Sequence, residues 1–326
     1  MISLGISFDG FVPIRDAVEI AKLAENCGIR SFWVAEHLGY RETFATSLAL
    51  AQATAEARIF PTSVSPYLRH PTPTAMALAS LSEYLPGRFG IAVGVGNPMF
   101  LRESGIAIEK PLKAVRDYVA AMRELMSCEP VTQEGLTFRL AGARMAFTPE
   151  DLPPIYLAPM GPKMLELSGE IGDGLVLSAG LTARFAGQSI EKAVVGARRS
   201  KRDPERFGKA SYLYFIAGGD RRERDEKVRQ KLAFLFRNEN LRANIHSSGL
   251  DIDQEAVMAA IARRDIAAAT ALIPQEAVEV FAIAGDANEC RTRLEAYANA
   301  GVEECVLSLL GTAEDKHRSL KIARTF

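Results

Sequence analysis

Short apolar segments rich in β-branched and aromatic residues alternate along the chain with longer segments whose apolar residues recur every three or four positions. The first kind predicts buried strands, and the second predicts amphipathic helices that cover them. The expected strands span residues 2–8, 31–35, 58–65, 89–94, 154–158, 174–178, 210–217 and 305–310. The helices expected between and after them span residues 14–27, 44–57, 71–84, 111–126, 163–170, 185–199 and 313–324.

This alternation predicts parallel strands joined by right-handed helical crossovers. Eight such units close most simply into an α/β TIM barrel, (β/α)8, as a single domain over residues 1–326. Periodicity alone also permits an open, doubly wound sheet. A small hairpin or loop excursion is expected over residues 135–147, at the N-terminal face of the sheet, because it follows a helix and precedes a strand.

The interval between the seventh and eighth expected strands breaks the regular spacing. It carries helical patterns over residues 224–236, 254–263, 275–281 and 288–300. We therefore assign residues 218–285 to a helical insertion between strands seven and eight. Because the insertion leaves the C-terminal end of a strand, we expect part of it to form a lid over that end, although extra outer helices would give the same pattern.

The composition is that of a well-folded chain, and it disfavours several functional classes. Of 326 residues, 48% are hydrophobic, and 39 Lys and Arg balance 40 Asp and Glu to a net charge of -1. This balance gives no indication of nucleic acid binding, and no apolar run is long enough to predict a membrane span. Four scattered cysteines without a C-x-x-C pair, and a start without a signal-peptide pattern, predict a cytoplasmic protein.

The second expected strand ends in two ionisable residues, Glu36 and His37. In parallel α/β proteins the C-terminal ends of the strands converge where active sites are built. A lone histidine is more often a hydrogen-bonded core residue, but the adjacent acid and the polar ends of the other strands favour a catalytic pair. Because successive strand residues point to opposite faces, both side chains reach the mouth only if the strand stops before them.

Other strand ends supply candidate binding residues. Gly94-Val95-Gly96 lacks the third glycine of a dinucleotide fingerprint, and Pro98 should interrupt the helix that would follow. Two glycines nevertheless let a flat ligand or a phosphate approach the backbone closely. A glycine followed by proline at the start of the fifth expected helix leaves N–H groups that suit a phosphate. Ordinary helix initiation explains the same pattern equally well. The candidates at these ends are Ser63, Val64, Ser65, Gly94, Gly96, Asn97, Met160, Gly161, Pro162 and Ser178.

Metal and hydrolase chemistry find little support in the sequence. The four histidines form no H-x-H or H-x-x-x-H pair, no metal ligand is predicted, and no G-x-S-x-G elbow occurs. A mouth rich in glycine and backbone groups, with one imidazole and one carboxylate, suits a bound organic cofactor that supplies the reactivity. A cofactor-free binding barrel and a metal-dependent barrel hydrolase are the alternatives.

Several stretches, in a shared order from Leu4 to about Ile322, resemble the luciferase-like flavin and deazaflavin oxidoreductases. They include Ser31-Phe-Trp-Val-Ala-Glu-His37, Arg69-His70-Pro71, Leu85-Pro-Gly-Arg-Phe89 and Ile171-Gly-Asp-Gly174. Within this family the methylenetetrahydromethanopterin reductase-like members are most similar, through Ser104–Pro111, Pro154–Pro162, Leu167–Gly174 and Phe281–Gly285.

The resemblance implies a (β/α)8 barrel, usually a homodimer, that holds FMN or coenzyme F420 at its C-terminal mouth. The family's acid–histidine pair beside the cofactor ring falls on Glu36 and His37, with His37 donating or relaying a proton. Its third-strand bulge, which often carries a non-prolyl cis peptide, falls on Ser63-Val64. Its cofactor-tail loop falls on Gly94, Gly96 and Asn97, and its phosphate contact falls on Gly161 and Pro162.

One difference from the family's motifs restricts the range of activities that we expect. Sugar-phosphate dehydrogenases of this family carry a catalytic Glu just after the glycine loop, where this chain has Asn97-Pro98. Oxidation of sugar phosphates is therefore disfavoured. Hydride transfer by a reductase and oxygenation by a flavin-dependent monooxygenase both fit the remaining residues, and the small organic substrate is not identified.

Overall fold

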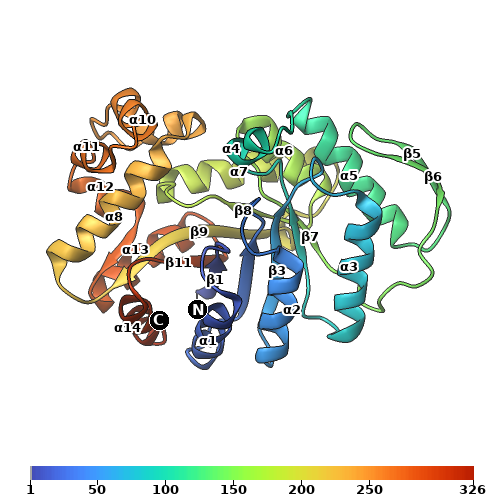
Figure 1. Ribbon diagram of the computed structural model, residues 1–326, viewed down its shortest axis with the longest axis horizontal. Helices are drawn as coiled ribbons and strands as arrows, with labels where there is room; N and C mark the ends of the chain where they lie inside the picture. The colour runs from blue at the N-terminus through green and yellow to red at the C-terminus, as the bar shows by residue number, and fades with distance from the viewer. Residues whose placement is uncertain (1) are drawn as a thin grey trace.

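The computed structural model describes residues 2–326 and shows eight parallel strands that close into a barrel (Figure 1). Each strand pairs with the next in chain order, and the last pairs with the first, so the sheet has no open edge in this circuit. The TIM barrel prediction is confirmed and the open sheet is excluded. The strands are β1 (Ser3–Phe8), β2 (Ser31–Ala35), β3 (Arg58–Val64), β4 (Ile91–Val93), β7 (Ile155–Leu157), β8 (Gly174–Leu177), β9 (Gly208–Ala217) and β11 (Glu304–Leu309).

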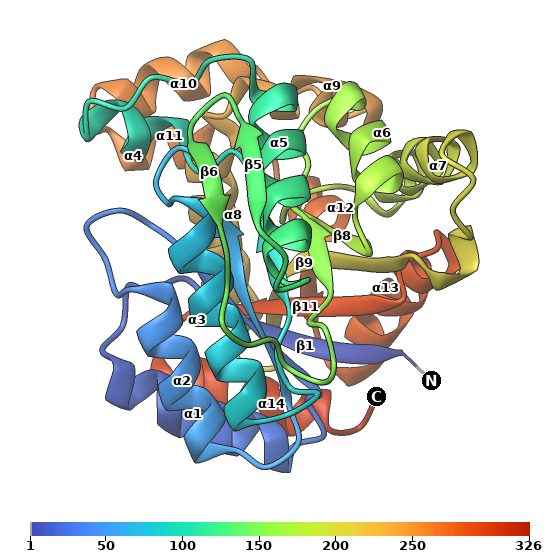
Figure 2. The same ribbon diagram turned by 90° about the vertical axis from the view of Figure 1, so that its right-hand side faces the viewer.

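Helices cover the outside of the barrel in the order that the hydrophobic pattern predicts (Figure 2). In α1, for example, the small residues Ala17, Ala21 and Ala24 share one face and are buried against the barrel. No helix among residues 2–326 is long and apolar enough to cross a membrane. The surrounding helices are α1 (Ile14–Asn26), α2 (Thr43–Ala53), α3 (Pro71–Tyr84), α5 (Pro111–Leu125), α6 (Pro162–Ile171), α7 (Ala183–Arg199), α13 (Ala287–Asn299) and α14 (Ala313–Ala323), with the short α4 (Pro98–Glu103) before α5.

Helical segments fill most of the interval between β9 and β11, as the sequence predicts, but the interval also holds a strand that the sequence analysis missed. Strand β10 (Ile283–Gly285) pairs in parallel with the second half of β9, whose first half pairs with β8. Only Ala282 separates this strand from α12, so its apolar residues merge with those of the predicted helix over residues 275–281. The helices are α8 (Arg221–Phe236), α9 (Arg242–Ser247), α10 (Gln254–Ala262), α11 (Ile266–Ala271) and α12 (Glu276–Phe281), with a 3-10 turn at Glu239–Leu241; another 3-10 turn, Pro204–Arg206, precedes β9.

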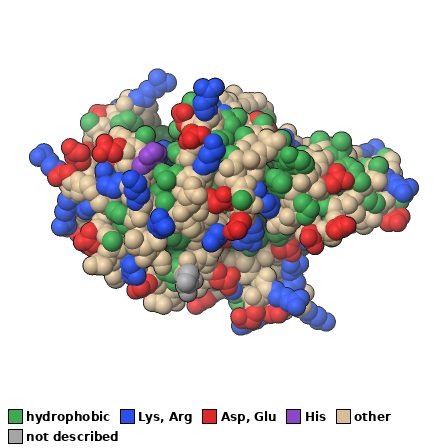
Figure 3. Space-filling model, turned by 90° about the horizontal axis from the view of Figure 1, so that it is seen from below, with side chains coloured by type: hydrophobic (Ala, Val, Ile, Leu, Met, Phe, Trp, Pro, Cys, Tyr) green, Lys and Arg blue, Asp and Glu red, His purple; other side chains and the backbone are tan. Residues whose placement is uncertain are grey.

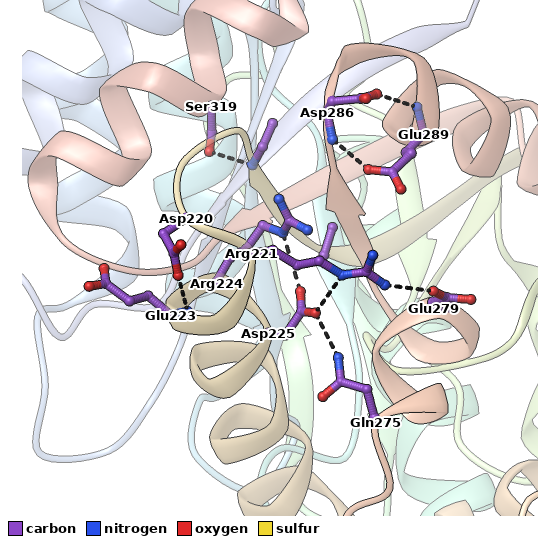
Figure 4. A network of polar contacts seen from close by, with 12 residues as sticks. Asp220, Arg221, Glu223, Arg224, Asp225, Gln275, Glu279, Asp286, Glu289 and Ser319 are labelled. Carbon is purple, nitrogen blue, oxygen red and sulfur yellow. Dashed lines mark hydrogen bonds and ion pairs between the residues drawn. The ribbon is translucent and has the colours of Figure 1, made fainter.

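A network of ion pairs and hydrogen bonds fixes the start of α8 to the segment around α12 (Figure 4). The buried carboxylate of Asp225 accepts a hydrogen bond from Gln275 Nε2 at 2.6 Å and pairs with Arg224 at 3.3 Å. Arg221 lies 3.6 Å from both Asp225 and Glu279. Two residues of α8, Arg221 and Asp225, therefore hold the start of this helix to the segment around α12.

The predicted hairpin exists, as β5 (Val131–Glu134) and β6 (Arg139–Ala143), but its predicted position was wrong. Its turn packs on α5, where Leu136 N–H donates to the Asp117 carboxylate at 2.9 Å, and Figure 2 shows both strands beside that helix. The Phe138 ring lies 5.9 Å from the ring of His70, which caps the N-terminus of α3 just beyond the C-terminal end of β3. The hairpin therefore runs along the outside of the barrel to its opposite end, because burial of Phe138 against His70 draws it there.

The core has two parts. The larger part fills the space between strands and helices, and the smaller part fills the barrel interior with Trp33, Phe60, Ala92, Val176, Ala210 and Val306. The Trp33 ring stacks on Phe60 at 4.2 Å and meets Tyr212 edge-on at 6.3 Å. Since β2 and β9 are not neighbours, the contact of Trp33 with Tyr212 crosses the interior, and the barrel is solid at this level.

Charged residues of both signs mix on the surface. Figure 3 shows Lys, Arg, Asp and Glu interspersed with apolar side chains on the face seen from below. This view agrees with the near-zero net charge of -1, and it gives no support to a polyanionic partner.

Candidate active site at the mouth of the barrel

The floor of the mouth is made almost entirely of small side chains. These residues stand two positions beyond the inward-facing residues of the barrel core, so they point inward as well. The Ser7 and Ser308 hydroxyls are 2.6 Å apart on this level. Small side chains above a layer of large aromatics leave room for a flat group. The floor residues are Ser7, Ala35, Thr62, Gly94, Ala158, Ser178, Tyr212 and Ser308.

Tyr212 is the large residue of this floor, and its hydroxyl is an unusual polar group. The Tyr212 Oη atom is buried and makes no hydrogen bond within residues 2–326. The Thr62 hydroxyl beside it donates instead to the Phe60 carbonyl at 2.9 Å. A buried hydroxyl without a partner costs free energy, and a polar group of a ligand would relieve that cost.

His37 lies on the wall of the mouth just above the floor. Its Nδ1 atom is 3.0 Å from the Asp9 carbonyl oxygen, and because a carbonyl only accepts, Nδ1–H donates. Burial lowers the pKa of His37, the Asp9 carboxylate opposes this, and Lys231 lowers the pKa further. The neutral imidazole is therefore favoured at neutral pH, with Nε2 left as a proton acceptor.

Three aromatic rings surround the imidazole of His37. Phe11 stacks on it with ring centroids 5.5 Å apart, Phe100 lies at 5.4 Å, and Tyr40 lies at 6.4 Å. These rings come from the segments that follow β1, β4 and β2. They fix the orientation of the imidazole and partly exclude water from it, which accounts for the lowered pKa of His37.

The structure separates Glu36 from His37. Glu36 Oε1 accepts a hydrogen bond from Arg69 Nε at 2.5 Å, and the Arg69 guanidinium lies 5.0 Å above the Phe44 ring of α2. Glu36 therefore points outward, toward the helices, while His37 points into the mouth. Burial raises the pKa of Glu36 although Arg69 opposes it, and Glu36 Oε2 makes no hydrogen bond within the described residues.

Arg69 is a supporting residue that the list of candidates missed. It donates to Glu36 and also pairs with Glu42, whose carboxylate caps α2 through Ala45 N–H. One guanidinium thus ties the end of β2, the start of α2 and the loop after β3 together. The Arg69-His70-Pro71 motif was the available signal, but it does not indicate the partner of Arg69.

The candidate residues at the end of β3 mainly determine the course of the backbone there and contribute little to the lining of the mouth. The cis peptide bond joins Thr62 and Ser63, one residue earlier than the expected Ser63-Val64, within a register shift against β4. Val64 is fully buried in the outer core, so its side chain does not face the mouth. Ser65 Oγ donates to the Val95 carbonyl at 2.7 Å and fastens this segment to the next one.

The glycine segment after β4 leads into a helix, which corrects the expectation that Pro98 prevents one. Asn97 accepts a hydrogen bond from Met99 N–H at 3.0 Å and caps α4, where Pro98 takes a first-turn position that suits its fixed φ. A Cβ atom at Gly94 would lie 2.9 Å from Ser63 Oγ and 3.1 Å from the Ala158 carbonyl oxygen. Gly94 is thus required for the close approach of three strand ends, and Gly96 has a φ of 90° that favours glycine.

The start of α6 has the features that a phosphate group needs. The helix begins on Gly161, with φ of 79°, and Pro162, and it has no side-chain cap. His70, Thr182 and Asp220 cap α3, α7 and α8 with their side chains, whereas α5, like α6, has no side-chain cap. The free N–H groups of the first turn of α6 therefore fit a phosphate such as that of FMN or F420. Met160, 40% exposed, lies beside them.

Helices α8 and α9 of the interval between β9 and β11 lie along one side of the mouth. In α9, the buried Asn244 donates from Nδ2 to the Gly180 carbonyl at 2.8 Å and accepts from Thr182 N–H at 3.0 Å. Gly180 and Thr182 belong to the segment that follows β8. Within residues 2–326, no three His, Cys, Asp or Glu side chains gather in a way that would hold a metal ion.

Comparison with known protein families matches residues 5–304 to luciferase-like monooxygenases. The 5,10-methylenetetrahydromethanopterin reductase of Methanolobus tindarius is 29% identical over 318 residues, which cover 97% of each chain. Among solved structures, the coenzyme F420 dependent tetrahydromethanopterin reductase from Methanopyrus kandleri superposes with a TM-score of 0.89 at 23% identity, over 99% of this chain and 97% of that one.

A monooxygenase has the same fold. The oxygenating constituent of 3,6-diketocamphane monooxygenase from Pseudomonas putida, in complex with FMN, superposes with a TM-score of 0.73 at 17% identity. The alignment covers 98% of this chain and 96% of that one.

Proposed function

The chain belongs to the luciferase-like monooxygenase family, and on that premise we propose that it is an F420-dependent reductase with its active centre at His37. At the coarser level it is an oxidoreductase that uses FMN or F420 on a small-molecule substrate. The alignment with a 5,10-methylenetetrahydromethanopterin reductase over 97% of each chain favours hydride transfer over oxygenation.

The observation that carries the proposal is the position of His37 Nε2. This nitrogen is the free one, because Nδ1 is engaged by the Asp9 carbonyl at 3.0 Å. It lies over a floor of small side chains where a flat ring has room. F420 or FMN, when bound, would supply the hydride chemistry.

The residues of the chain then have separate tasks. His37 would hold or transfer a proton at Nε2, the role expected of a neutral imidazole beside a reacting group. Gly94 gives the ring close access to the strand ends, and the uncapped amides of α6 at Gly161 would bind a phosphate. Asn97, Ser65 and Ser63 maintain the loops around the ring, and Glu36 orients the loop that carries His37 through Arg69.

Cofactor titration tests the proposal directly. Purified protein is titrated separately with F420 and with FMN, and retention is followed by absorbance after desalting. Tight retention of F420 with slow reoxidation of its reduced form in air supports the reductase. Preferential retention of FMN with rapid oxygen consumption on reduction would instead establish a monooxygenase, and retention of neither cofactor would contradict both.

We also propose a role for the helical interval, an oligomeric state and a cellular compartment. Asn244 holds α9 to the segment after β8, which supports a partial lid formed within residues 218–285 of a single domain. The resemblance to the family supports a homodimer, which light scattering coupled to size-exclusion chromatography would test. The cysteines are free in the structure, which suits a reducing, cytoplasmic location.

A further inference from the structure

One face of α8 runs across the ends of three neighbouring strands. Lys231 and Leu235 are spaced i and i+4, so they share that face, and Asn238, two residues past the end of α8 at Phe236, extends it. The Lys231 ammonium group lies 5.6 Å from the Tyr214 ring of β9.

The other two residues of this face reach the next strand ends. A Cβ atom at Gly180, just after β8, would lie 2.2 Å from Leu235 Cδ2. Asn238 Nδ2 is 4.0 Å from Met160 Sδ, which follows β7. This face of α8 therefore forms a wall of the mouth, with Lys231 at its β9 end.

Lys231 differs from the other lysine on this side of α8. Lys227, one turn earlier, forms an ion pair with Asp315 at 2.8 Å. Lys231 has no carboxylate within 4.0 Å and no hydrogen bond in the part of the chain that the structure describes, although it is partly buried. A partly dehydrated ammonium group without a counter-ion costs free energy, which an incoming anion would offset.

The groups around Lys231 are those of the candidate active site. Asp9 and Lys231 both influence the pKa of His37, and Asp9 also acts on Lys231 and Tyr214. Arg237, the C-cap of α8, also acts on Tyr214, but its guanidinium donates to the Phe234 carbonyl at 2.5 Å and lies 3.5 Å from the centre of the Phe234 ring. Lys231 and Asp9 are thus the charged groups that act on both His37 and Tyr214 or their immediate neighbours.

We propose that Lys231 binds an anionic oxygen group of the substrate and so selects substrates that carry a carboxylate or phosphate near the reacting carbon. The inference rests on the proposed function, because it takes the mouth as the active site. It commits to the substrate as the source of the anion, since the phosphate site for the cofactor lies at Gly161, where the helix is uncapped. The position of Lys231 on α8 makes this helix a determinant of specificity.

The test uses the full chain with its histidines labelled with 15N and inorganic phosphate as the probe. The four histidines give few signals, and a H37Q variant assigns that of His37. Phosphate should shift the His37 ring signals in a saturable way, and K231Q should weaken this binding about tenfold or more, on the scale of one charge-assisted hydrogen bond. K231R, which keeps the charge, should retain most of the binding.

The matched control is K227Q, which removes a lysine from the same helix but leaves the mouth unchanged. Unaltered phosphate binding in K231Q, or equal weakening in K227Q, would overturn the proposal. So would a K231Q variant whose affinity for F420 or FMN falls as much as its affinity for phosphate, since the anion would then belong to the cofactor. Failure of the wild-type protein to retain a cofactor would contradict the proposed function instead, because the phosphate titration needs no cofactor.

Discussion

Glu36 and Arg69 form a buried ion pair, with Oε1 and Nε 2.5 Å apart, on the outer side of the barrel wall directly behind His37. Only 8% of the Glu36 side chain is exposed, against 30% of Arg69. The pair therefore supports the catalytic wall from behind and does not itself line the mouth. Loss of one partner should affect stability first and catalysis second.

Replacement of Arg69 by Gln should destabilise the protein by roughly 2–3 kcal/mol, somewhat below the usual loss for a buried pair because Arg69 is partly exposed. Burial already raises the pKa of Glu36, and loss of Arg69 raises it further. A carboxyl group with a raised folded-state pKa stabilises the fold below that pKa, and this contribution is lost as the pH rises through it. Urea unfolding of R69Q should thus show a larger deficit at pH 8 than at pH 5.

The double variant E36Q/R69Q provides the control for this pH effect. With no ionisable group left at the pair, the excess deficit at pH 8 over pH 5 should disappear. If the loss of stability in R69Q were the same at both pH values, Glu36 would not be a charged group buried in the fold.

Replacement of His37 by Ala should leave cofactor retention nearly unchanged and lower kcat by about 10²–10⁴-fold, the usual range for loss of a positioned proton donor or acceptor. H317A, which removes an exposed histidine from α14, is the control and should keep full activity. Because burial lowers the pKa of His37, the acidic limb of the wild-type kcat profile should lie below pH 6.5. Full turnover by H37A would eliminate the proposed role.

The Tyr212 hydroxyl has no hydrogen bond, so its removal should not destabilise the ligand-free protein. We expect Y212F to change the free energy of unfolding by less than about 0.5 kcal/mol, or to stabilise slightly. Y297F is the contrast, because Tyr297 Oη donates to the Leu181 carbonyl at 2.5 Å, and its loss should cost about 1–2 kcal/mol. If a bound cofactor uses the Tyr212 hydroxyl, Y212F should also weaken retention of F420 or FMN.

The Asn244 side chain should control the attachment of the helices between β9 and β11. N244A leaves a buried carbonyl at Gly180 and a buried N–H at Thr182 without partners, at a cost of about 2–4 kcal/mol. Hydrogen exchange should quicken in α9 and in the segment after β8 while β1–β4 stay protected. N240A, at an exposed position in the preceding turn, should leave exchange unchanged.

The fold followed from the sequence because its signals were local and repeated. Alternating buried strands and amphipathic helices predicted the barrel, and α3 begins and ends where the pattern placed it. Strand β10 was missed because only Ala282 separates it from α12, so its apolar residues continued the predicted helix. The hairpin was misplaced because contacts such as that of Phe138 with His70 join residues far apart in sequence.

The candidate site was harder to predict for a similar reason. Strand alternation suffices to point His37 inward and Glu36 outward, since β2 ends at Ala35 and the alternation continues past it. The same rule points Asp9 and Tyr214 toward the mouth, yet neither was selected, because a strand-end Asp or Tyr is common. Lys231 could not be found at all, since its place depends on how α8 crosses the barrel.

Because β10 pairs with β9, the helices between these two strands are attached to the barrel sheet at both ends and do not form a separate cover. The backbone that connects these helices to β9 and β10 has few places to bend. One is Gly218-Gly219, with φ of 71° and 75°, between β9 and α8, and the other is Ala282, the single residue between α12 and β10. Any opening of α8–α12 must turn at these two points or pull on β9. Because β9 carries Tyr212 and Tyr214, such a pull would transmit motion of the helices to the floor on which the reacting ring is expected to lie.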